Sequence, residues 1–223
     1  MIIYAHGGLA NRLRVILSFR SVYGPIDVLW KTDTQVSGAR FVDVFEPLKN
    51  VRFVYTTETF DTSTCHPCPE AKPGWQNSYR ELTLLPAHRA TLASLTANRP
   101  YSAVHIRRTD HVQLAKSYDK FTTDDQFVAW LRNAHSPIYL ATDNGSTQAQ
   151  FLAEIAETGK QVIVHGRIRE HAEQDKHDHR NTGLADAAID LFACAGAAWF
   201  MGSGASSFSD TATMLRKLGG WWS

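Results

Sequence analysis

The sequence predicts an α/β fold of two Rossmann-like halves, each built on a parallel sheet, with the two sheets facing a cleft. Short apolar runs alternate with segments of helical periodicity along most of the chain. The apolar runs are nearly continuous, which is typical of parallel strands buried on both faces. A break at Asn98-Arg99-Pro100 separates two such series. We therefore expect one domain over residues 1–99 and a second over residues 100–223.

In the first series we expect strands over residues 2–5, 26–30 and 51–55. A helix is predicted over residues 9–23, because apolar side chains recur on one face and Gly24-Pro25 follows as a stop signal. Residues 61–79 contain Pro, Cys, Gly and Thr without clear periodicity, which favours a long loop. A helix over residues 86–98 ends the series.

The second series repeats the alternation. Its strands are expected over residues 101–106, 138–141, 161–164 and 197–201. Its helices are expected over residues 123–133, 147–157, 183–195 and 206–218. Thr123 with Gln126, and Thr147 with Gln150, have the spacing of capping boxes at helix starts.

The bulk composition excludes some classes of partner. The 223 residues are 43% hydrophobic and 20% charged, with a formal net charge of +1. There is thus no overall electrostatic argument for binding nucleic acid or an anionic membrane, and any phosphate site must be local. The first residues lack the pattern of a signal peptide, and no apolar run is long enough for a transmembrane segment. We expect a soluble, cytoplasmic protein.

Two groups of residues raise the question of a metal. Cys65 and Cys68 form a C-x-x-C in a loop, without an obvious second ligand pair. Incidental loop cysteines are the favoured interpretation, with a metal site or a local disulfide as alternatives. Residues 165–180 hold four histidines without the i, i+4 spacing of a helical zinc site, which favours a solvated loop.

The most informative stretch is residues 105–110, His-Ile-Arg-Arg-Thr-Asp, at the end of an apolar strand. Ligands in open α/β sheets bind beyond the carboxyl ends of strands. Arg107 and Arg108 at this place predict an anion clamp, because a guanidinium fork matches two phosphate oxygens. A surface turn with a salt bridge is the alternative.

Two glycine-rich turns connect a strand to a helix. Gly7-Gly8 precedes Asn11 and Arg12, and residues 202–205 precede Ser206 and Ser207. Such turns let the backbone approach a ligand, and the helix start offers free N–H groups to a phosphate. The alternatives are a steric need for glycine and simple capping by serine.

Two carboxylates also stand out. Asp143 and Asn144 follow a strand, where they could contact a ribose or base, or cap the next helix. Asp190 lies within an apolar helix, and a partly buried carboxylate needs a donor. Guanine offers N1–H and N2–H, and a protein donor is the alternative.

Together these motifs resemble the fucosyltransferase superfamily, which includes α1,6-fucosyltransferases, bacterial nodulation fucosyltransferases and protein O-fucosyltransferases. Residues 105–110 match its H-x-R-x-x-D motif. Residues 139–144 resemble its second motif, and Asp190-Leu191-Phe192 followed by Ser206-Ser207 resembles the third. Residues 8–12 resemble the G-x-x-N-Q/R opening of its first domain.

The resemblance implies a GT-B fold and a metal-independent, inverting transfer from the nucleotide sugar GDP-β-L-fucose to a carbohydrate acceptor. It implies that Arg107 neutralises the departing GDP and that Asp110 fixes the geometry of the arginine. Asn11 would face the sugar and β-phosphate from the opposite domain. The remaining binding residues implied by motif or turn are Gly8, His105, Arg108, Asp143, Asn144, Asp190, Ser206 and Ser207.

Three positions depart from the α1,6 branch. Where that branch has a lysine and a glutamate after the first motif, this chain has His111 and Ala115, and the second motif ends in Asn144 instead of Asp. His111 is a candidate catalytic base, because its pKa lies near neutrality. Asp110, or no protein base at all, are the alternatives. A GDP-sugar-binding protein without catalysis, a transferase using another GDP-hexose, and a zinc-dependent module also stay open.

Overall fold

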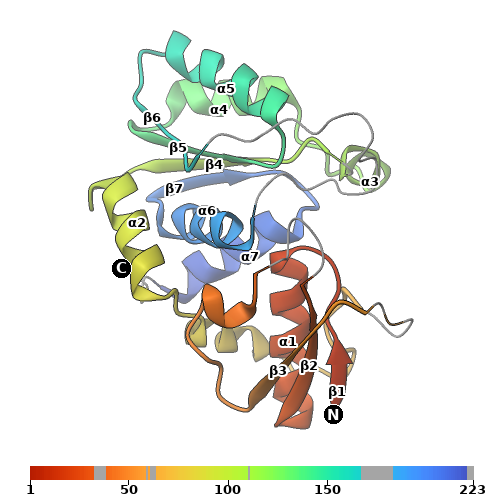
Figure 1. The fold of residues 1–223 in the computed structure, drawn as a ribbon. Coiled ribbons are helices and arrows are strands. Elements are labelled where there is room, and N and C mark those ends of the chain that lie inside the picture. Colours follow the sequence, from red (N-terminus) through yellow and green to blue (C-terminus); the bar gives the residue numbers. More distant parts are fainter. Residues whose placement is uncertain (33–38, 59, 61–63, 110, 167–182, 220–223) are drawn as a thin grey trace.

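The structure is a computed structural model, which describes residues 1–32, 39–58, 60, 64–109, 111–166 and 183–219. It is an α/β protein with two parallel sheets (Figure 1). This confirms the fold class that the sequence predicts. Among the described residues, no helix is both long and apolar enough to cross a bilayer.

The first sheet has the order β1-β2-β3, with strands β1 (Ile2–Tyr4), β2 (Ile26–Lys31) and β3 (Val51–Thr56). Helix α1 (Leu9–Tyr23) connects β1 to β2, and its bounds are those that the periodicity predicts. The short 3-10 helix η1 (Phe41–Asp43) precedes β3. Trp30 of β2 packs edge-to-face against Phe41 and Phe53, which fills the sheet face beside η1.

Two helices follow β3. The 3-10 helix η2 (Trp75–Glu81) begins inside the segment predicted as a long loop, so that prediction is wrong from residue 75 onward. Its position is fixed by a tertiary ion pair, because Glu81 accepts from Arg20 of α1 at 2.6 Å. Helix α2 (Pro86–Thr96) ends two residues earlier than predicted, because Ala97 and Asn98 adopt positive φ.

The second sheet has the order β6-β5-β4-β7, with all neighbours parallel. Its strands are β4 (Ser102–Ile106), β5 (Ile138–Thr142), β6 (Val162–Ile163) and β7 (Trp199–Gly202). Its helices are α3 (His111–Ser117), α4 (Asp124–Asn133), α5 (Gly145–Glu157), α6 (Leu184–Gly196) and α7 (Ser207–Leu218). The predicted β6 is too long by two residues, and α3 is an element that the sequence analysis does not predict.

The N-caps of α4 and α5 can be compared with the two capping boxes that the sequence predicts. Thr123 caps α4, and its box with Gln126 is present, as predicted. The cap of α5 is Asn144, whose Oδ1 accepts from Thr147 N at 2.7 Å. The prediction that α5 starts at a Thr147 box is wrong, because the helix begins at Gly145 with Asn144 as its cap, so Thr147 already lies within the first turn.

Helices cover both faces of the second sheet (Figure 1). On one face Val104 and Ile106 of β4 pack with Phe127 of α4 and Phe151 of α5. On the other face, where α6 and α7 lie, Ala103 joins a separate cluster. Alternate residues of β4 therefore face different layers, which places His105 on the α6–α7 side.

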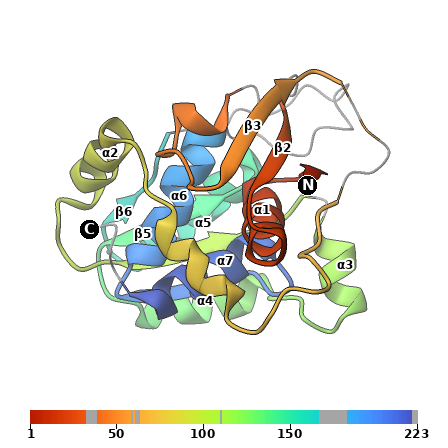
Figure 2. The same cartoon turned by 90° about the horizontal axis from the view of Figure 1, so that it is seen from below.

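The two sheets share one hydrophobic core. Helices α6 and α7 lie between the second sheet and α1, and α1 packs against both (Figures 1 and 2). Phe45, which precedes β3, contacts Phe192 of α6 with ring centroids 6.2 Å apart. Helix α2 also packs on α6. Buried side chains from both series thus form one continuous cluster.

Candidate functional site

Arg107 lies where β4 ends, between the ends of its two neighbouring strands. Its backbone N–H donates to Ser203 Oγ after β7, at 2.8 Å. Its side chain is 19% exposed, and Nε lies 3.6 Å from Asp143 Oδ2 after β5. Three strand ends therefore meet at Arg107, through its backbone and its side chain, at the edge of the sheet where α/β proteins bind ligands.

Asp143 organises the loop that follows β4. Its Oδ1 accepts from the backbone N–H of Arg108 at 3.1 Å, and its Oδ2 accepts from the Thr109 hydroxyl at 2.6 Å. Burial raises the pKa of the Asp143 carboxyl, while the Thr109 hydroxyl, the Arg108 amide and the Arg107 charge act in the opposite direction. The side chain expected to contact a nucleotide is thus engaged in holding Arg107 and Thr109.

The Arg108 guanidinium is bound by the protein. It donates to Asp124 Oδ1 at 2.6 and 3.0 Å and to the Thr122 carbonyl at 2.8 Å. The rings of Phe121 and Phe127 lie 4.8 and 5.2 Å from its central carbon. Arg107 and Arg108 therefore do not form a paired clamp: Arg108 joins the loop to α4, and Arg107 remains the arginine of the site.

His105 is held from α7. Its ring is 5% exposed, and Nδ1 lies 2.8 Å from Ser209 Oγ. The ring also stacks on Phe208, with centroids 4.3 Å apart. Burial and two neighbours on one helix leave the imidazole little rotational freedom.

The glycine-rich turn between β7 and α7 allows close packing of backbone. A Cβ on Gly204 would lie 1.9 Å from the Lys120 carbonyl oxygen, so this position excludes any side chain. Ser206 is buried and caps α7, accepting from Ser209 N, so capping accounts for this serine. Ser207 is the first residue of α7 and is half-buried.

The first glycine-rich turn precedes α1. Gly7 has a φ of +88°, which favours glycine, and Gly8 is the N-cap of α1. Arg12 is 5% exposed, donates to the Gly7 carbonyl at 2.9 Å and stacks over Trp30, which fixes the turn. The Asn11 Oδ1 atom is buried and has no hydrogen-bond partner among the described residues. Such an oxygen is a candidate ligand contact, because an unpaired buried acceptor is unfavourable.

Asp190 faces the second sheet from α6 and is 8% exposed. Its Oδ1 accepts from the Tyr139 hydroxyl at 2.6 Å, which is the protein donor that the sequence left as an alternative to guanine. Burial raises the pKa of the Asp190 carboxyl to about 7, and the Asp186 charge adds to the shift, while Tyr139 and His165 oppose it. Within the described part of the chain, Oδ2 has no hydrogen-bond partner, so it remains available to a ligand.

The candidate bases are only partly placed. Asp110 lies outside the described residues, and His111 is the first residue of α3. Ala115 is 2% exposed in the same helix, so no polar group stands at the position of the missing glutamate. Asn144 is engaged as the cap of α5, with its Oδ1 accepting from Ser146 as well as Thr147.

The metal alternative finds no support in the residues that the structure describes, where no cluster of three His, Cys, Asp or Glu side chains could hold an ion. Cys65 and Cys68 are free thiols. The backbone N–H of Cys68 donates to Ser18 Oγ of α1, so this loop is anchored by hydrogen bonds. Of the four histidines in residues 165–180, only His165 is described, and it pairs with Asp186 at 3.0 Å.

Sequence reasoning did not predict the contacts of four residues of this region, namely Thr109, Asp124, Ser203 and Ser209, although Thr109 and Ser203 lie inside stretches that it singled out. Each makes a hydrogen bond to a motif residue from a distant part of the chain, such as Ser203 to Arg107. Single serines and threonines are too common for such a role to be recognised from composition. The flanking glycines at 202 and 204 were the one available signal.

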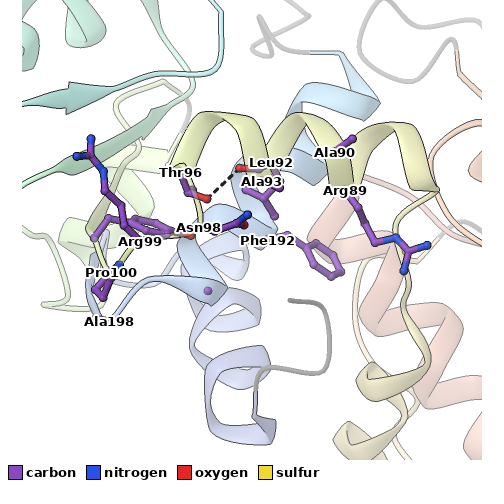
Figure 3. Close-up of a pocket in the computed structure, with 12 residues that line it drawn as sticks. Arg89, Ala90, Leu92, Ala93, Thr96, Asn98, Arg99, Pro100, Phe192 and Ala198 are labelled. Atoms are coloured by element: carbon purple, nitrogen blue, oxygen red, sulfur yellow. Dashed lines mark hydrogen bonds between the residues drawn. The ribbon is translucent and has the colours of Figure 1, made fainter.

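A separate cavity of about 660 Å³ lies between α2 and α6 (Figure 3). Its lining includes Tyr101 and Ala198, which precede β4 and β7, so it lies at the edge of the second sheet opposite to Arg107. Phe192 and Leu92 contribute apolar surface to it, and the Thr96 hydroxyl is engaged by the Leu92 carbonyl. It is not part of the candidate site.

Solved structures with this fold exist, although neither a protein-family model nor a curated protein sequence matches the chain. A crystal structure of POFUT1 in complex with GDP gives a TM-score of 0.62 at 12% identity, covering 99% of this chain and 96% of that chain. A structure of POFUT1 with GDP-fucose gives 0.51 at 14% identity, covering 78% of this chain and 52% of that chain. The fucosyltransferase NodZ from Bradyrhizobium gives 0.59 at 15% identity, covering 96% and 93%.

These matches extend over both sheets, which is more than the sequence resemblance covers in detail. The chain has the fucosyltransferase-like, two-sheet α/β fold of POFUT1 and NodZ.

Proposed function

We propose that this protein is a metal-independent, inverting glycosyltransferase that moves L-fucose from GDP-β-L-fucose to a hydroxyl group of a glycan or glycoconjugate. The observation that carries the proposal is the placement of Arg107 at the meeting point of the ends of β4, β5 and β7. The fold supports it, because POFUT1 has been crystallised with GDP-fucose.

The chemistry of the transfer asks for positive charge beside the leaving group. As the glycosidic bond breaks, negative charge grows on the diphosphate while the sugar becomes oxocarbenium-like. Arg107 would bind the pyrophosphate and neutralise this charge. The first turn of α7 would add backbone N–H groups and the positive end of the helix dipole, with Ser207 beside them.

The first half of the chain would supply contacts from the other side of the donor. Asn11 has a buried Oδ1 without a partner among the described residues, and a sugar hydroxyl would satisfy it. The Gly7-Gly8 turn would let the phosphate approach the backbone. Asp190 Oδ2 would accept from guanine, with His105 as a second contact to the base.

The acceptor hydroxyl must lose its proton as the new glycosidic bond forms, either to a protein base or to a phosphate oxygen of the departing GDP. Asp110 and His111 are the proposed candidates, because Asp110 is the last residue of the arginine motif and His111 follows it directly. A transfer without a protein base is the third alternative, since Ala115 occupies the place of the glutamate.

A second candidate function is nucleotide-sugar binding without transfer. The buried Ala115 favours it, because this chain lacks the carboxylate proposed as base in the α1,6 branch. Transfer from another GDP-hexose is a third candidate. Calorimetry with GDP-fucose, other GDP-hexoses and UDP-sugars identifies the preferred donor. A preference for UDP-sugars would contradict the proposed contacts with guanine.

The test is Arg107→Ala, measured by calorimetric GDP binding and by GDP release from GDP-fucose with and without glycan acceptors. One charge-assisted contact is worth about 1.5–3 kcal/mol, so we expect a loss of ~10²-fold in turnover. Arg99→Ala is the matched control, because Arg99 is exposed and bonds Gln161 at the opposite sheet edge. If Arg107→Ala bound GDP and released it from GDP-fucose as the parent chain does, the proposal would be overturned. Tight GDP binding by the parent chain without release over a broad acceptor panel would favour the second candidate.

A further inference from the structure

The cavity between α2 and α6 has an apolar lining and no part in the candidate site. Its volume is about 660 Å³, and Leu92 and Ala93 of α2 line it together with Phe192 of α6 (Figure 3). Apolar surface gathered in one hollow is unfavourable in contact with water, because burial of such surface is the main favourable term in folding. The lining therefore indicates an apolar occupant.

Helix α2 would gain from such an occupant. Of its 11 residues, all of which the structure describes, Thr96 is the buried one, while Leu92 and Ala93 are half-buried. A helix of this length is marginal in water unless tertiary packing supports it. Additional apolar cover on the cavity side of α2 would therefore stabilise the helix against α6.

The end of α7 brings the following residues of the chain to this cavity. Arg216, in the last turn of α7, donates to the backbone carbonyls of Ala197 and Ala198, and Ala198 lines the cavity. Gly219, three residues further on, ends the helix with a φ of +91°. Residues 220–223 span at most ~14 Å when extended, at ~3.5 Å per residue. A segment of this length reaches the cavity from Gly219.

Residues 220–223 carry side chains that suit an apolar cavity. Their sequence is Gly-Trp-Trp-Ser, with two adjacent indoles and no charge, and they lie outside the described part of the chain. Each tryptophan has on the order of 150–250 Å² of surface to bury. In an extended chain, consecutive side chains point to opposite sides, so one indole of the pair can enter the cavity at a time.

We propose that an indole of the Trp221-Trp222 pair occupies the α2–α6 cavity and holds α2 against α6. The occupant is thus a segment of the same chain. The proposal does not depend on nucleotide binding, because the cavity lies at the edge of the second sheet opposite to Arg107. Failure of the chain to bind GDP would overturn the proposed function and leave this inference intact.

The contact is tested by NMR on the full chain with labelled Leu and Ala methyl groups. We expect nuclear Overhauser effects between an indole ring and the methyl groups of Leu92 and Ala93. These effects should be lost in Trp221→Ala or in Trp222→Ala, which identifies the inserted ring. In a mixture of labelled and unlabelled chains, the effects should arise within one chain. Their absence, their survival in both variants, or effects only between chains would overturn the proposal.

The support of α2 is tested by hydrogen exchange. In the tryptophan variant that loses the methyl contacts, the amides of α2 should exchange about tenfold faster or more, because the helix loses apolar cover. Trp199→Ala is the matched control, since Trp199 is an exposed indole that stacks on His135 and should leave α2 unchanged. If α2 exchanged at the parent rate in both tryptophan variants, its proposed support would be overturned.

An independent variant fills the cavity from the side of α2. Ala93→Leu adds bulk to the lining, so it should displace the indole and weaken the effects on the Leu92 methyl groups. Ser94→Leu is the matched control, because Ser94 is exposed and is not among the described residues that line the cavity. Equal effects on Leu92 in the two variants would contradict the placement of the indole beside Ala93.

Discussion

At the scale of single residues, Asp190 combines a cost in stability with a candidate role in binding. It is a buried carboxylate with one protein donor, Tyr139, and burial raises its pKa to about 7. Residues of this kind occur at functional sites, where ligand contacts offset the cost of burial.

The raised pKa predicts a pH dependence of stability. Between the unfolded pKa near 3.8 and the folded value of about 7, the folded chain binds more protons, so this group destabilises the fold as pH rises through that window. Asp190→Asn keeps an acceptor for Tyr139 and removes the charge. We expect it to raise the free energy of unfolding at pH 8 by on the order of 3 kcal/mol and to weaken GDP binding.

Urea denaturation at a series of pH values checks this prediction. Asp186→Asn is the control on the same helix, because its hydrogen bond with His165 lowers the Asp186 pKa. That substitution should give no gain at pH 8. A loss of stability in Asp190→Asn at pH 8 would show that the carboxylate is stabilising, contrary to the prediction.

Residue patterns also explain which parts of the site were predictable. Arg107, Asn11 and Asp190 could be singled out because polar side chains follow or interrupt apolar runs. The role of Arg108 could not be read in this way, because Asp124 and Phe121, which bind its guanidinium, lie on segments with no sequence link to the motif. Two adjacent arginines cannot be told apart in the sequence, because the direction in which each side chain points is decided by the residues that pack around it in the folded chain.

At the scale of elements, the turn from β7 to α7 is the most constrained connection of the site. Gly204 donates its N–H to Thr122 Oγ1 at 3.0 Å and lies against the Lys120 carbonyl. The turn thus packs directly on the segment between α3 and α4.

Gly204→Ala should destabilise the protein by about 1–3 kcal/mol or more, because its Cβ would meet a backbone oxygen that cannot rotate away. The free energy of unfolding in urea measures the effect. Gly183→Ala is the matched control, since Gly183 has an ordinary φ of −64° and its nearest obstacle is the flexible Asp186 side chain. Equal stability of the two variants would contradict the close packing of this turn.

The observed bounds of an element match the predicted ones where local sequence signals decide them. Helix α1 matches its periodicity and glycine stop, and Thr123 caps α4. The 3-10 helix η2 was missed, because its position depends on the Arg20–Glu81 contact with α1. Local patterns do not report contacts over sixty residues.

At the scale of the whole molecule, the continuous core predicts that both sheets unfold together. Phe192 is fully buried in α6 and contacts Phe45 from the first half of the chain. Phe192→Ala should lower the free energy of unfolding by about 3–5 kcal/mol. Because the core is shared, slowly exchanging amides of β2 and β5 should lose protection by the same amount.

Native-state hydrogen exchange measures both strands at once. Tyr118→Ala is the control, because Tyr118 is 62% exposed and should change stability by less than about 0.5 kcal/mol. If β2 kept its protection in Phe192→Ala while β5 lost it, the two halves would be separate folding units.

The sequence by itself determined the α/β class, the parallel sheets, most helices and strands, and the residues around which a site could form. Apolar periodicity and glycine placement are local properties, so they can be read one segment at a time. Only the tertiary structure decided that the two series share one core, that Arg108 turns to Asp124 while Arg107 stays at the strand ends, and that Ser209 meets His105. These are contacts between residues far apart in the chain, and their energies depend on burial and direction, which exist only once the elements are packed together.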